Sequence, residues 1–282
     1  MVEKFLRLLE KHREKVSPLT QEEILNYKTI INNDKEIYLP RSQEVGVLLF
    51  HSFTSTPYEF CDLAQYLADK GLTVYAPKIA GHGTSPKDLA QVTLQDWEQS
   101  AENAYNFLTQ KVNKIFIVGS SFGGNLAFYL ASKYNNPLGG VISMGTPIKI
   151  KWQKIVKARA YTYGLFKQYY KKRKSNYVYK LLLVDQEQIV YPVIPISSLR
   201  RLFSFIKKHT IPNLKDIKSP TLIIQSSADK VVNPNSAQFI HENLGSEDKR
   251  ILWINGCSHA LAIDEKRWVI YKSIYRFISG NL

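Results

Sequence analysis

Cysteine is scarce in this sequence. Cys61 and Cys257 are the only two among 282 residues, and they stand far apart with no Cys-x-x-Cys spacing. His12 likewise has no second candidate ligand at a coordinating spacing, so we expect it to be a surface residue. We therefore expect no metal site and no cofactor, and we expect both cysteines to be buried free thiols.

Long apolar segments are also absent. No apolar run approaches the ~20 residues that a membrane-spanning helix needs. Residues 1–15 carry charges on both sides of short apolar pairs, which is unlike a signal peptide, so we expect a cytoplasmic location. The length suits one large α/β domain with an insertion, or two small domains, and either would bury a sizeable core.

Acidic residues are missing from one segment. The formal net charge of the chain is +14, and eleven lysines and arginines lie between Lys149 and Val184 without a single Asp or Glu. The rest of the chain is close to balanced. Positive charge concentrated in this way raises nucleic acid or an anionic surface as a partner.

From Val45 onward the sequence repeats a pattern of strand, loop and helix. The pattern predicts strands at 46–50, 72–77, 115–118, 140–145, 221–225 and 250–254. It predicts helices at 58–70, 93–110, 125–131, 236–244 and 266–279. Such alternation is typical of an α/β fold in which a mostly parallel central sheet carries helices on both faces.

The alternation stops between residues 148 and 212, where the sequence is basic and aromatic and predicts helices. An insertion between two strands of such a sheet lies at one edge of it, so we interpret 148–212 as a helical cap. Residues 45–147 and 213–282 then form the core. Residues 1–44 are predicted to be a helical and β extension without catalytic residues.

A Gly-x-Ser-x-Gly motif joins a predicted strand to a predicted helix. The strand 115–118 leads into Gly119, Ser121 and Gly123, and a helix-forming run follows. The motif is typical of a nucleophile elbow, in which a sharp turn exposes the serine hydroxyl at the carboxyl edge of a parallel sheet. The glycines leave room for backbone that side chains would block, and the helix start aims free N–H groups at the site.

Two later loops carry the side chains that a nucleophilic serine needs, a base and an acid that fixes the tautomer of the base. Asp229 follows the predicted strand 221–225, and His259 follows the predicted strand 250–254. The chain order Ser, Asp, His at strand ends predicts that Ser121, Asp229 and His259 form a catalytic triad. Asp264, five residues after His259, is expected to shape that loop or to cap the last helix.

Two backbone N–H groups are expected to stabilise the oxyanion that forms during acyl transfer. The residue after the nucleophile, Phe122, normally supplies one of them. The loop after the first buried strand supplies the other, and Phe53 is the candidate there. Each such donor can lower the barrier by ~3 kcal/mol.

With these residues the sequence resembles the α/β-hydrolase superfamily and, within it, the bacterial carboxylesterase and monoacylglycerol lipase family. The resemblance covers about Val45 to Leu282. The shared motifs are Phe50-His51-Ser52-Phe53-Thr54, Ala76-Pro77 with Gly81-His82-Gly83, Asp96-Trp97, Gly119 to Gly124, Asp229 with Asn233-Pro234 and Ser236-Ala237, and Ser258-His259 with Asp264. Position by position, the resemblance implies a triad of Ser121, Asp229 and His259, with Phe53 and Phe122 as oxyanion donors.

The sequence departs from the family pattern in three places. Ser52 replaces a glycine, which would constrain the oxyanion loop if that position needed a positive φ. Ser258 replaces the glycine before the histidine, and the first 44 residues exceed what the family usually carries. The triad itself is intact.

The cap segment allows more than one interpretation. Val156, Tyr163, Phe166 and Tyr170 fall on one helical stripe with lysines around it. The stripe is expected to roof the acyl pocket while the lysines are solvated. Alternatively, the cap lies on an anionic membrane and draws acyl esters from it. Nucleic-acid binding through Lys171 to Lys174 is the rival hypothesis, although no recognition fold accompanies that run.

Together these observations predict a metal-independent serine ester hydrolase that works through an acyl-enzyme intermediate. Its expected substrates are small acyl esters, namely monoacylglycerols or carboxylic esters with short to medium acyl chains. The alternatives are a feruloyl-type esterase for aromatic acyl groups and a non-enzymatic basic binding protein.

Overall fold

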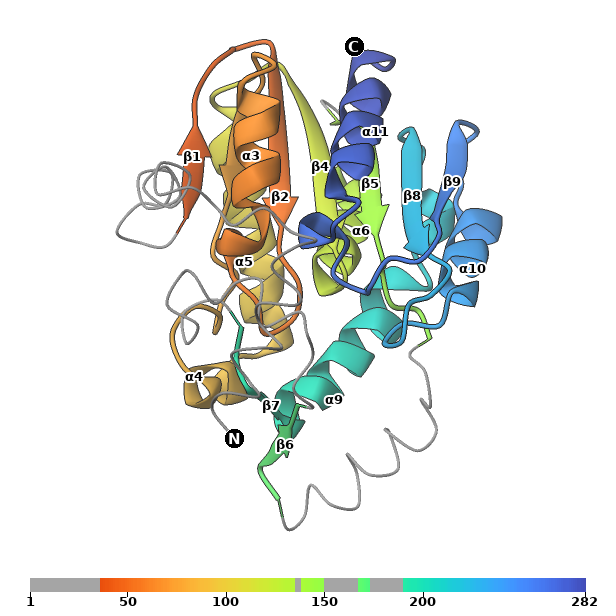
Figure 1. The fold of residues 1–282 in the computed structure, drawn as a ribbon. Coiled ribbons are helices and arrows are strands. Elements are labelled where there is room, and N and C mark those ends of the chain that lie inside the picture. Colours follow the sequence, from red (N-terminus) through yellow and green to blue (C-terminus); the bar gives the residue numbers. More distant parts are fainter. Residues whose placement is uncertain (1–35, 135–137, 150–166, 173–189) are drawn as a thin grey trace, which may run out of the picture.

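The computed structural model describes residues 36–134, 138–149, 167–172 and 190–282 (Figure 1). Within these ranges a seven-stranded sheet forms the centre, in the spatial order β1-β3-β2-β4-β5-β8-β9. Its strands are β1 (Ile37–Leu39), β2 (Val45–Phe50), β3 (Thr73–Ala76), β4 (Lys114–Ser120), β5 (Leu138–Met144), β8 (Thr221–Ser226) and β9 (Lys249–Ile254). All neighbouring pairs are parallel except β1 with β3, which confirms the mostly parallel sheet predicted from the sequence.

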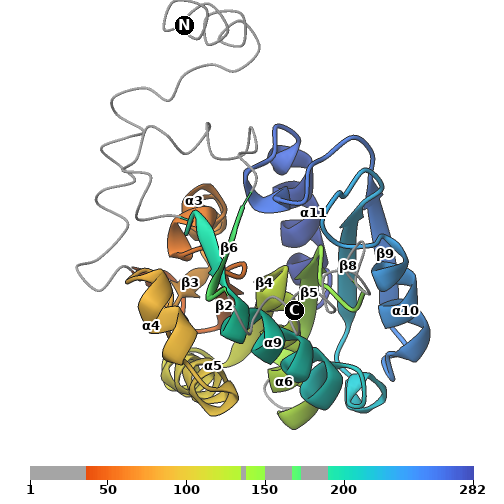
Figure 2. The same cartoon turned by 90° about the horizontal axis from the view of Figure 1, so that it is seen from below.

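Helices cover both faces of this sheet (Figure 2). On one face lie α3 (Cys61–Ala68) and α11 (Arg267–Ser279). On the other face lie α5 (Leu94–Thr109), α6 (Phe122–Lys133) and α10 (Asn235–Asn243). Each face buries its own apolar cluster against the strands. The alternating pattern predicted a parallel sheet with helices on both faces, and the resemblance implied the α/β-hydrolase fold; the structure confirms this layering.

The start of α5 shows how the local sequence decides an element. The Asp96 N–H donates to the Thr93 hydroxyl at 3.1 Å, and the Thr93 N–H donates to the Asp96 carboxylate at 2.8 Å. This capping box satisfies N–H groups that the first turn of a helix leaves without partners. Beyond it, Trp97, Tyr105 and Leu108 recur at helical spacing and are buried. The helix matches the predicted range 93–110 to within one residue at each end.

The amino-terminal boundary of the core lies earlier than the sequence predicts. Residues 1–44 were expected to stand outside the sheet, whereas β1 pairs antiparallel with β3 at its edge. Ile37 is completely buried in the cluster beneath α3, and this contact joins the short strand to the core. The helices predicted before residue 36 lie outside the described residues.

The described part of the cap contains a ribbon as well as a helix. Strand β6 (Tyr169–Lys171) pairs antiparallel with β7 (Val193–Pro195), and α9 (Ile196–Phe205) follows. The prediction of a helical segment is therefore wrong for these two strands. Pro192 and Pro195 lack the N–H that a helix interior uses, and a proline holds the residue before it extended.

The ribbon, α9 and the short helix α4 (Pro86–Gln91) lie together beyond the carboxyl ends of the parallel strands (Figures 1 and 2). Of the predicted aromatic stripe, Val156, Tyr163 and Phe166 lie outside the described residues. Its last member, Tyr170, lies on β6 with half of its surface exposed. The described part of the predicted cap thus lies beyond the edge of the sheet where the predicted site residues emerge.

The remaining local expectations concern the thiols and membrane-spanning helices. Cys61 and Cys257 are both free and buried, as predicted. Burial raises the pKa of both thiols, that of Cys257 to about 12, so both stay protonated and unreactive. No helix in the described ranges has the length and apolar composition needed to cross a membrane. The described residues also include short 3₁₀ helices at Pro57–Phe60, Leu214–Asp216 and Leu261–Ile263 and a π-helical segment at Ile206–Thr210.

Candidate active site

Ser121 stands in the sharp turn between β4 and α6. Its φ of 50° and ψ of −115° are rare for a residue with a side chain and strain the backbone. At this turn the backbone of α6 packs directly against the backbones of β2 and β4. A Cβ atom on Gly123 would lie 1.9 Å from the Phe50 carbonyl oxygen, and one on Gly119 would lie 2.2 Å from the Gly123 carbonyl oxygen. Close backbone approach therefore requires both glycines of the motif.

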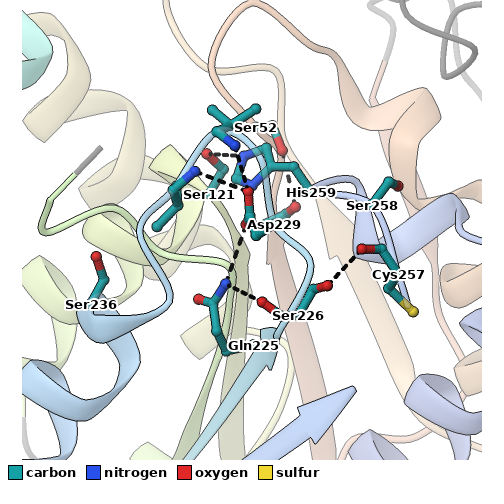
Figure 3. Close-up of polar contacts among 12 residues, drawn as sticks. Ser52, Ser121, Gln225, Ser226, Asp229, Ser236, Cys257, Ser258 and His259 are labelled. Atoms are coloured by element: carbon teal, nitrogen blue, oxygen red, sulfur yellow. Dashed lines mark hydrogen bonds and ion pairs between the residues drawn. The ribbon is translucent and has the colours of Figure 1, made fainter. Parts of the chain in front are cut away.

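The structure brings Ser121, Asp229 and His259 together at the carboxyl edge of the sheet (Figure 3). Asp229 lies in the loop after β8, and His259 lies in the loop after β9. His259 Nε2 is 3.0 Å from Ser121 Oγ, and His259 Nδ1 is 2.7 Å from Asp229 Oδ2. The three side chains thus form one continuous hydrogen-bonded chain, of the kind that activates a serine hydroxyl.

Asp229 is completely buried, and donors surround its carboxylate. Oδ1 accepts from the N–H groups of Val231 and Val232 at 2.8 and 2.9 Å. Oδ2 accepts from His259 and from the Gln225 side-chain amide, the latter at 3.2 Å. Burial by itself raises the pKa of Asp229, but the His259 hydrogen bond and charge and the backbone donors outweigh it and lower the pKa. The carboxylate is therefore ionised and holds a proton on His259 Nδ1.

The two residues expected to donate N–H groups to the oxyanion, Phe53 and Phe122, lie side by side in the structure. Phe122 is the first residue of α6, where N–H groups have no acceptor within the helix. The ring of Phe53 contacts the ring of Phe122, with 5.9 Å between the ring centroids. The carbonyl oxygen of Ser52 accepts from the Ser55 N–H at 3.0 Å. Because C=O and N–H point in opposite directions across a trans peptide, this contact also orients the Phe53 N–H.

His51 is completely buried and holds the same peptide. Its Nε2 accepts from the Ile79 N–H at 3.2 Å, so the proton of the neutral ring is on Nδ1, which donates to the Ser52 carbonyl at 3.0 Å. Burial, helped by the neighbouring His82, lowers the pKa of His51 well below its usual value. The ring is therefore neutral and keeps this tautomer. His51 belongs to one of the motifs shared with the family, but nothing in the sequence indicates this role.

Ser52 does not have the positive φ that its replacement of glycine raised as a concern; in this loop the positive φ is at Thr54. The Ser52 N–H and hydroxyl donate to Glu59 at 2.9 and 2.7 Å. Glu59 also accepts from the Ser120 hydroxyl at 2.6 Å. A buried carboxylate thus ties the loop to the residue before Ser121. Sequence reasoning missed Glu59, because one glutamate at a helix start forms no distinctive pattern.

Asp264 shapes the loop that carries His259, as predicted. Its Oδ2 accepts from the N–H and hydroxyl of Ser258 at 2.9 and 3.0 Å, and its Oδ1 accepts from the Lys266 N–H at 3.1 Å. Ser258, the second departure from the family pattern, supplies one of these bonds through its side chain. The carboxylate that contacts His259 is that of Asp229.

The groups at this edge of the sheet are suited to nucleophilic catalysis. Among the described residues, no group of three or more His, Cys, Asp or Glu side chains is arranged to hold a metal ion. A hydroxyl, a base and an ionised carboxylate lie in line beside the first turn of a helix, whose free N–H groups suit a developing negative charge. This arrangement can transfer an acyl group from an ester to the serine and then to water.

The sequence matches the family described as serine aminopeptidase, S33, over residues 42–266. It is 31% identical over 246 residues to a thermostable monoacylglycerol lipase of Bacillus sp. (strain H-257), covering 87% of this chain and 95% of that one. It is 28% identical over 234 residues to a carboxylesterase of Bacillus subtilis (strain 168), covering 83% and 92%. A solved structure reported with the metagenome-derived lipolytic enzymes LipS and LipT matches with a TM-score of 0.78 at 26% identity, covering 89% and 99%.

Proposed function

The chain belongs to the serine aminopeptidase S33 family of α/β-hydrolases, and we propose that Ser121, Asp229 and His259 are its catalytic triad. The protein is a serine ester hydrolase. The observation that carries the triad is the chain of two hydrogen bonds, 2.7 Å from Asp229 to His259 and 3.0 Å from His259 to Ser121.

Acylation follows from this geometry. Ser121 Oγ attacks the ester carbonyl carbon while His259 Nε2 takes the hydroxyl proton, and Asp229 stabilises the imidazolium that forms. The N–H groups of Phe53 and Phe122 stabilise the negative charge on the former carbonyl oxygen. His259 then gives its proton to the departing alcohol, which leaves Ser121 acylated.

Deacylation uses the same groups in reverse roles. A water molecule attacks the acyl carbon while His259 Nε2 takes one of its protons. The tetrahedral intermediate collapses, the Ser121 oxygen leaves and recovers the proton from His259, and the carboxylic acid departs. Overall one ester and one water become one acid and one alcohol, with no change of oxidation state.

The proposed substrates are monoacylglycerols and other carboxylic esters with short to medium acyl chains. The similar lipase of Bacillus sp. (strain H-257) supports the first class by its name. The partly exposed ring of Phe53 packs against Phe122 and Trp97, which provides an apolar surface next to the nucleophile. Initial rates on esters from acetyl to palmitoyl, with monoacylglycerols and feruloyl esters included, test this choice. A clear preference for feruloyl esters would contradict it.

The decisive test of the triad is the variant Ser121→Ala. Because the covalent route needs the hydroxyl, we expect this variant to lose ester turnover and labelling by a fluorophosphonate probe. Ser258→Ala is the matched control, since Ser258 lies beside His259 in sequence but binds Asp264. It should be labelled like the wild type. Labelling that persists in Ser121→Ala would assign the nucleophile to another serine.

We also propose that the cap contacts anionic membrane surfaces, from which acyl esters enter the site. On and before strand β6, Tyr169 and Tyr170 are exposed large aromatics, and Lys167 and Lys171 beside them are exposed cations. Exposed aromatic and basic side chains within one short segment suit the boundary of an anionic bilayer. The division of the chain into core and cap and the cytoplasmic location remain sequence predictions.

A further inference from the structure

A lysine of the cap reaches the loop that carries the oxyanion donor Phe53. Lys172 follows β6, and its backbone N–H donates to the Pro192 carbonyl at 3.1 Å. Its ammonium group donates to Thr54 Oγ1. The Thr54 hydroxyl in turn donates to the Phe53 carbonyl oxygen at 2.5 Å. A chain of hydrogen bonds therefore runs from the cap lysine to the residue whose N–H is proposed to stabilise the oxyanion.

Thr54 needs such support because its backbone is strained. Its φ is 63°, in the left-handed region, which is a rare conformation for a β-branched residue. Strain of this kind costs roughly 1–3 kcal/mol and persists only where the surroundings hold the residue in place. Thr54 is buried, and the contacts to its hydroxyl and its carbonyl come from the cap.

The second of these contacts comes from Tyr191, just before β7. Its N–H donates to the Thr54 carbonyl at 2.9 Å. The Tyr191 hydroxyl donates to the Gly81 carbonyl at 3.0 Å and accepts from the Thr84 N–H at 2.9 Å. The cap is thus bonded to both loops, 51–56 and 81–85, that border the site on this side. Among the cap residues that make these contacts, Lys172 and Tyr191, only Lys172 carries a charge.

We propose that Lys172 is a positioning residue for ester hydrolysis: from the cap it holds Thr54 in its strained conformation and so keeps the Phe53 N–H aimed at the developing oxyanion. The inference rests on the proposed function, because it needs Phe53 to be an oxyanion donor. Without the Lys172 bond, Thr54 relaxes toward ordinary φ values and the Phe53–Thr54 peptide turns with it, which displaces Phe53 and its N–H. The loss falls on the transition state, because the charge that the N–H stabilises develops there.

The charges around Lys172 make this contact dependent on pH. The ammonium group is enclosed although the residue as a whole is only partly buried, and this desolvation lowers the pKa of Lys172 to about 8. Glu59, from the turn 57–60, opposes the decrease. His82, from the loop after β3, faces the ammonium but is neutral, since burial lowers its pKa to about 4. Lys171, next in sequence, is exposed to solvent.

The signs of the two pH effects differ. A neutral amine is a weaker donor to Thr54, so kcat should decrease as the pH rises through about 8. For stability, the folded-state pKa lies below the unfolded value, so the buried charge destabilises the fold at neutral pH. This penalty disappears as the pH rises from about 8 toward the unfolded value of ~10.4. Removal of the charge should therefore leave the thermal midpoint at pH 7 unchanged or raise it.

The experiment compares Lys172→Met with Lys207→Met, which changes an exposed lysine of the predicted cap in the segment Ile206–Thr210, and with Lys172→Arg, which keeps the charge. Rates on a water-soluble ester are measured from pH 6 to 10, together with the thermal midpoint. For Lys172→Met we expect kcat to fall ~10- to 100-fold, less than the ~10²- to 10³-fold loss for an oxyanion donor, with KM changed less than about 2-fold. The decrease in kcat above pH 8 should disappear in this variant. Lys207→Met should match the wild type, and Lys172→Arg should retain activity above pH 8.

Two results would overturn the inference. One is wild-type kcat and an unchanged alkaline decrease in Lys172→Met. The other is a loss of kcat that accompanies a lower thermal midpoint, because that would be a structural defect. Ser121→Ala is measured in parallel to separate the two proposals. If Ser121→Ala retains turnover, the proposed triad fails whatever Lys172 does. If Ser121→Ala is inactive and Lys172→Met is fully active, only the role of Lys172 fails.

Discussion

The assignment of Asp229 as the acid of the triad predicts a large effect for Asp229→Asn. The asparagine has one side-chain oxygen where the aspartate has two. In the wild type, one oxygen accepts from the N–H groups of Val231 and Val232, and the other accepts from His259 and Gln225. The asparagine oxygen should stay with the two backbone N–H groups, which places its NH₂ group against the two side-chain donors.

This arrangement forces His259 into the wrong tautomer. With an NH₂ group at 2.7 Å, His259 Nδ1 must accept instead of donate, so the ring proton moves to Nε2. Nε2 then faces Ser121 Oγ at 3.0 Å as a donor and cannot take its proton. Loss of the base in this way lowers kcat by about 10⁴-fold in a serine protease, equivalent to ~5.4 kcal/mol of barrier. We expect a decrease of that order, with a residual rate from the oxyanion donors.

Asp264→Asn is the matched control, because Asp264 is the other carboxylate of this region and binds Ser258 and Lys266. We expect it to lower kcat less than about 10-fold, since only the loop changes. Initial rates on a p-nitrophenyl ester measure both variants, and a circular dichroism melt establishes that each is folded. The reasoning would be refuted if Asp264→Asn were the more damaging change, or if Asp229→Asn kept a tenth of the wild-type kcat.

Two further predictions concern acid stability and membranes. Burial lowers the pKa of His82 to about 4, so the unfolded chain binds more protons between pH ~6.5 and 4 and stability is lost as pH falls through that window. In urea unfolding, His82→Phe should reduce the slope of the unfolding free energy against pH by up to ~1.4 kcal/mol per pH unit. An unchanged slope would contradict this prediction. Lys167→Gln with Lys171→Gln should weaken co-sedimentation with anionic vesicles about 30-fold, at ~1 kcal/mol per lysine, and 1 M salt should abolish it. Equal binding to zwitterionic vesicles would oppose the docking proposal.

The membrane test omits Lys172 for a structural reason. The sequence groups Lys171 to Lys174 as one basic run, whereas the structure separates two of its members. Lys171 is exposed, and Lys172 turns inward to Thr54. Arg173 and Lys174 lie outside the described residues. A variant that neutralised the whole run would mix a surface effect with an effect on the oxyanion loop.

The sequence by itself determined the fold class and the composition of the site. Short apolar runs alternating with amphipathic helices leave few arrangements other than a parallel sheet covered on both faces. The carboxyl ends of parallel strands share one edge, so Ser121, Asp229 and His259, each in the turn or loop that follows a strand, had to emerge near one another. Gly119 and Gly123 indicated the sharp turn, because only residues without a side chain allow the backbone segments to approach so closely. Each of these signals lies within a few consecutive residues, so it can be recognised from the sequence alone.

Only the tertiary structure decided the contacts between distant segments. Lys172 and Thr54 are separated by 118 positions, Tyr191 and Gly81 by 110, and Ser120 and Glu59 by 61. No periodicity connects such pairs, because they depend on how an insertion and a loop pack over the sheet edge. The ribbon of the cap escaped prediction for the same reason, because three residues are too few to show a pattern. Strand β1 belongs to the β extension predicted from the sequence, but its pairing with β3 in the central sheet was not predicted. The sequence names the reacting side chains, and the packing decides which residues hold them in place.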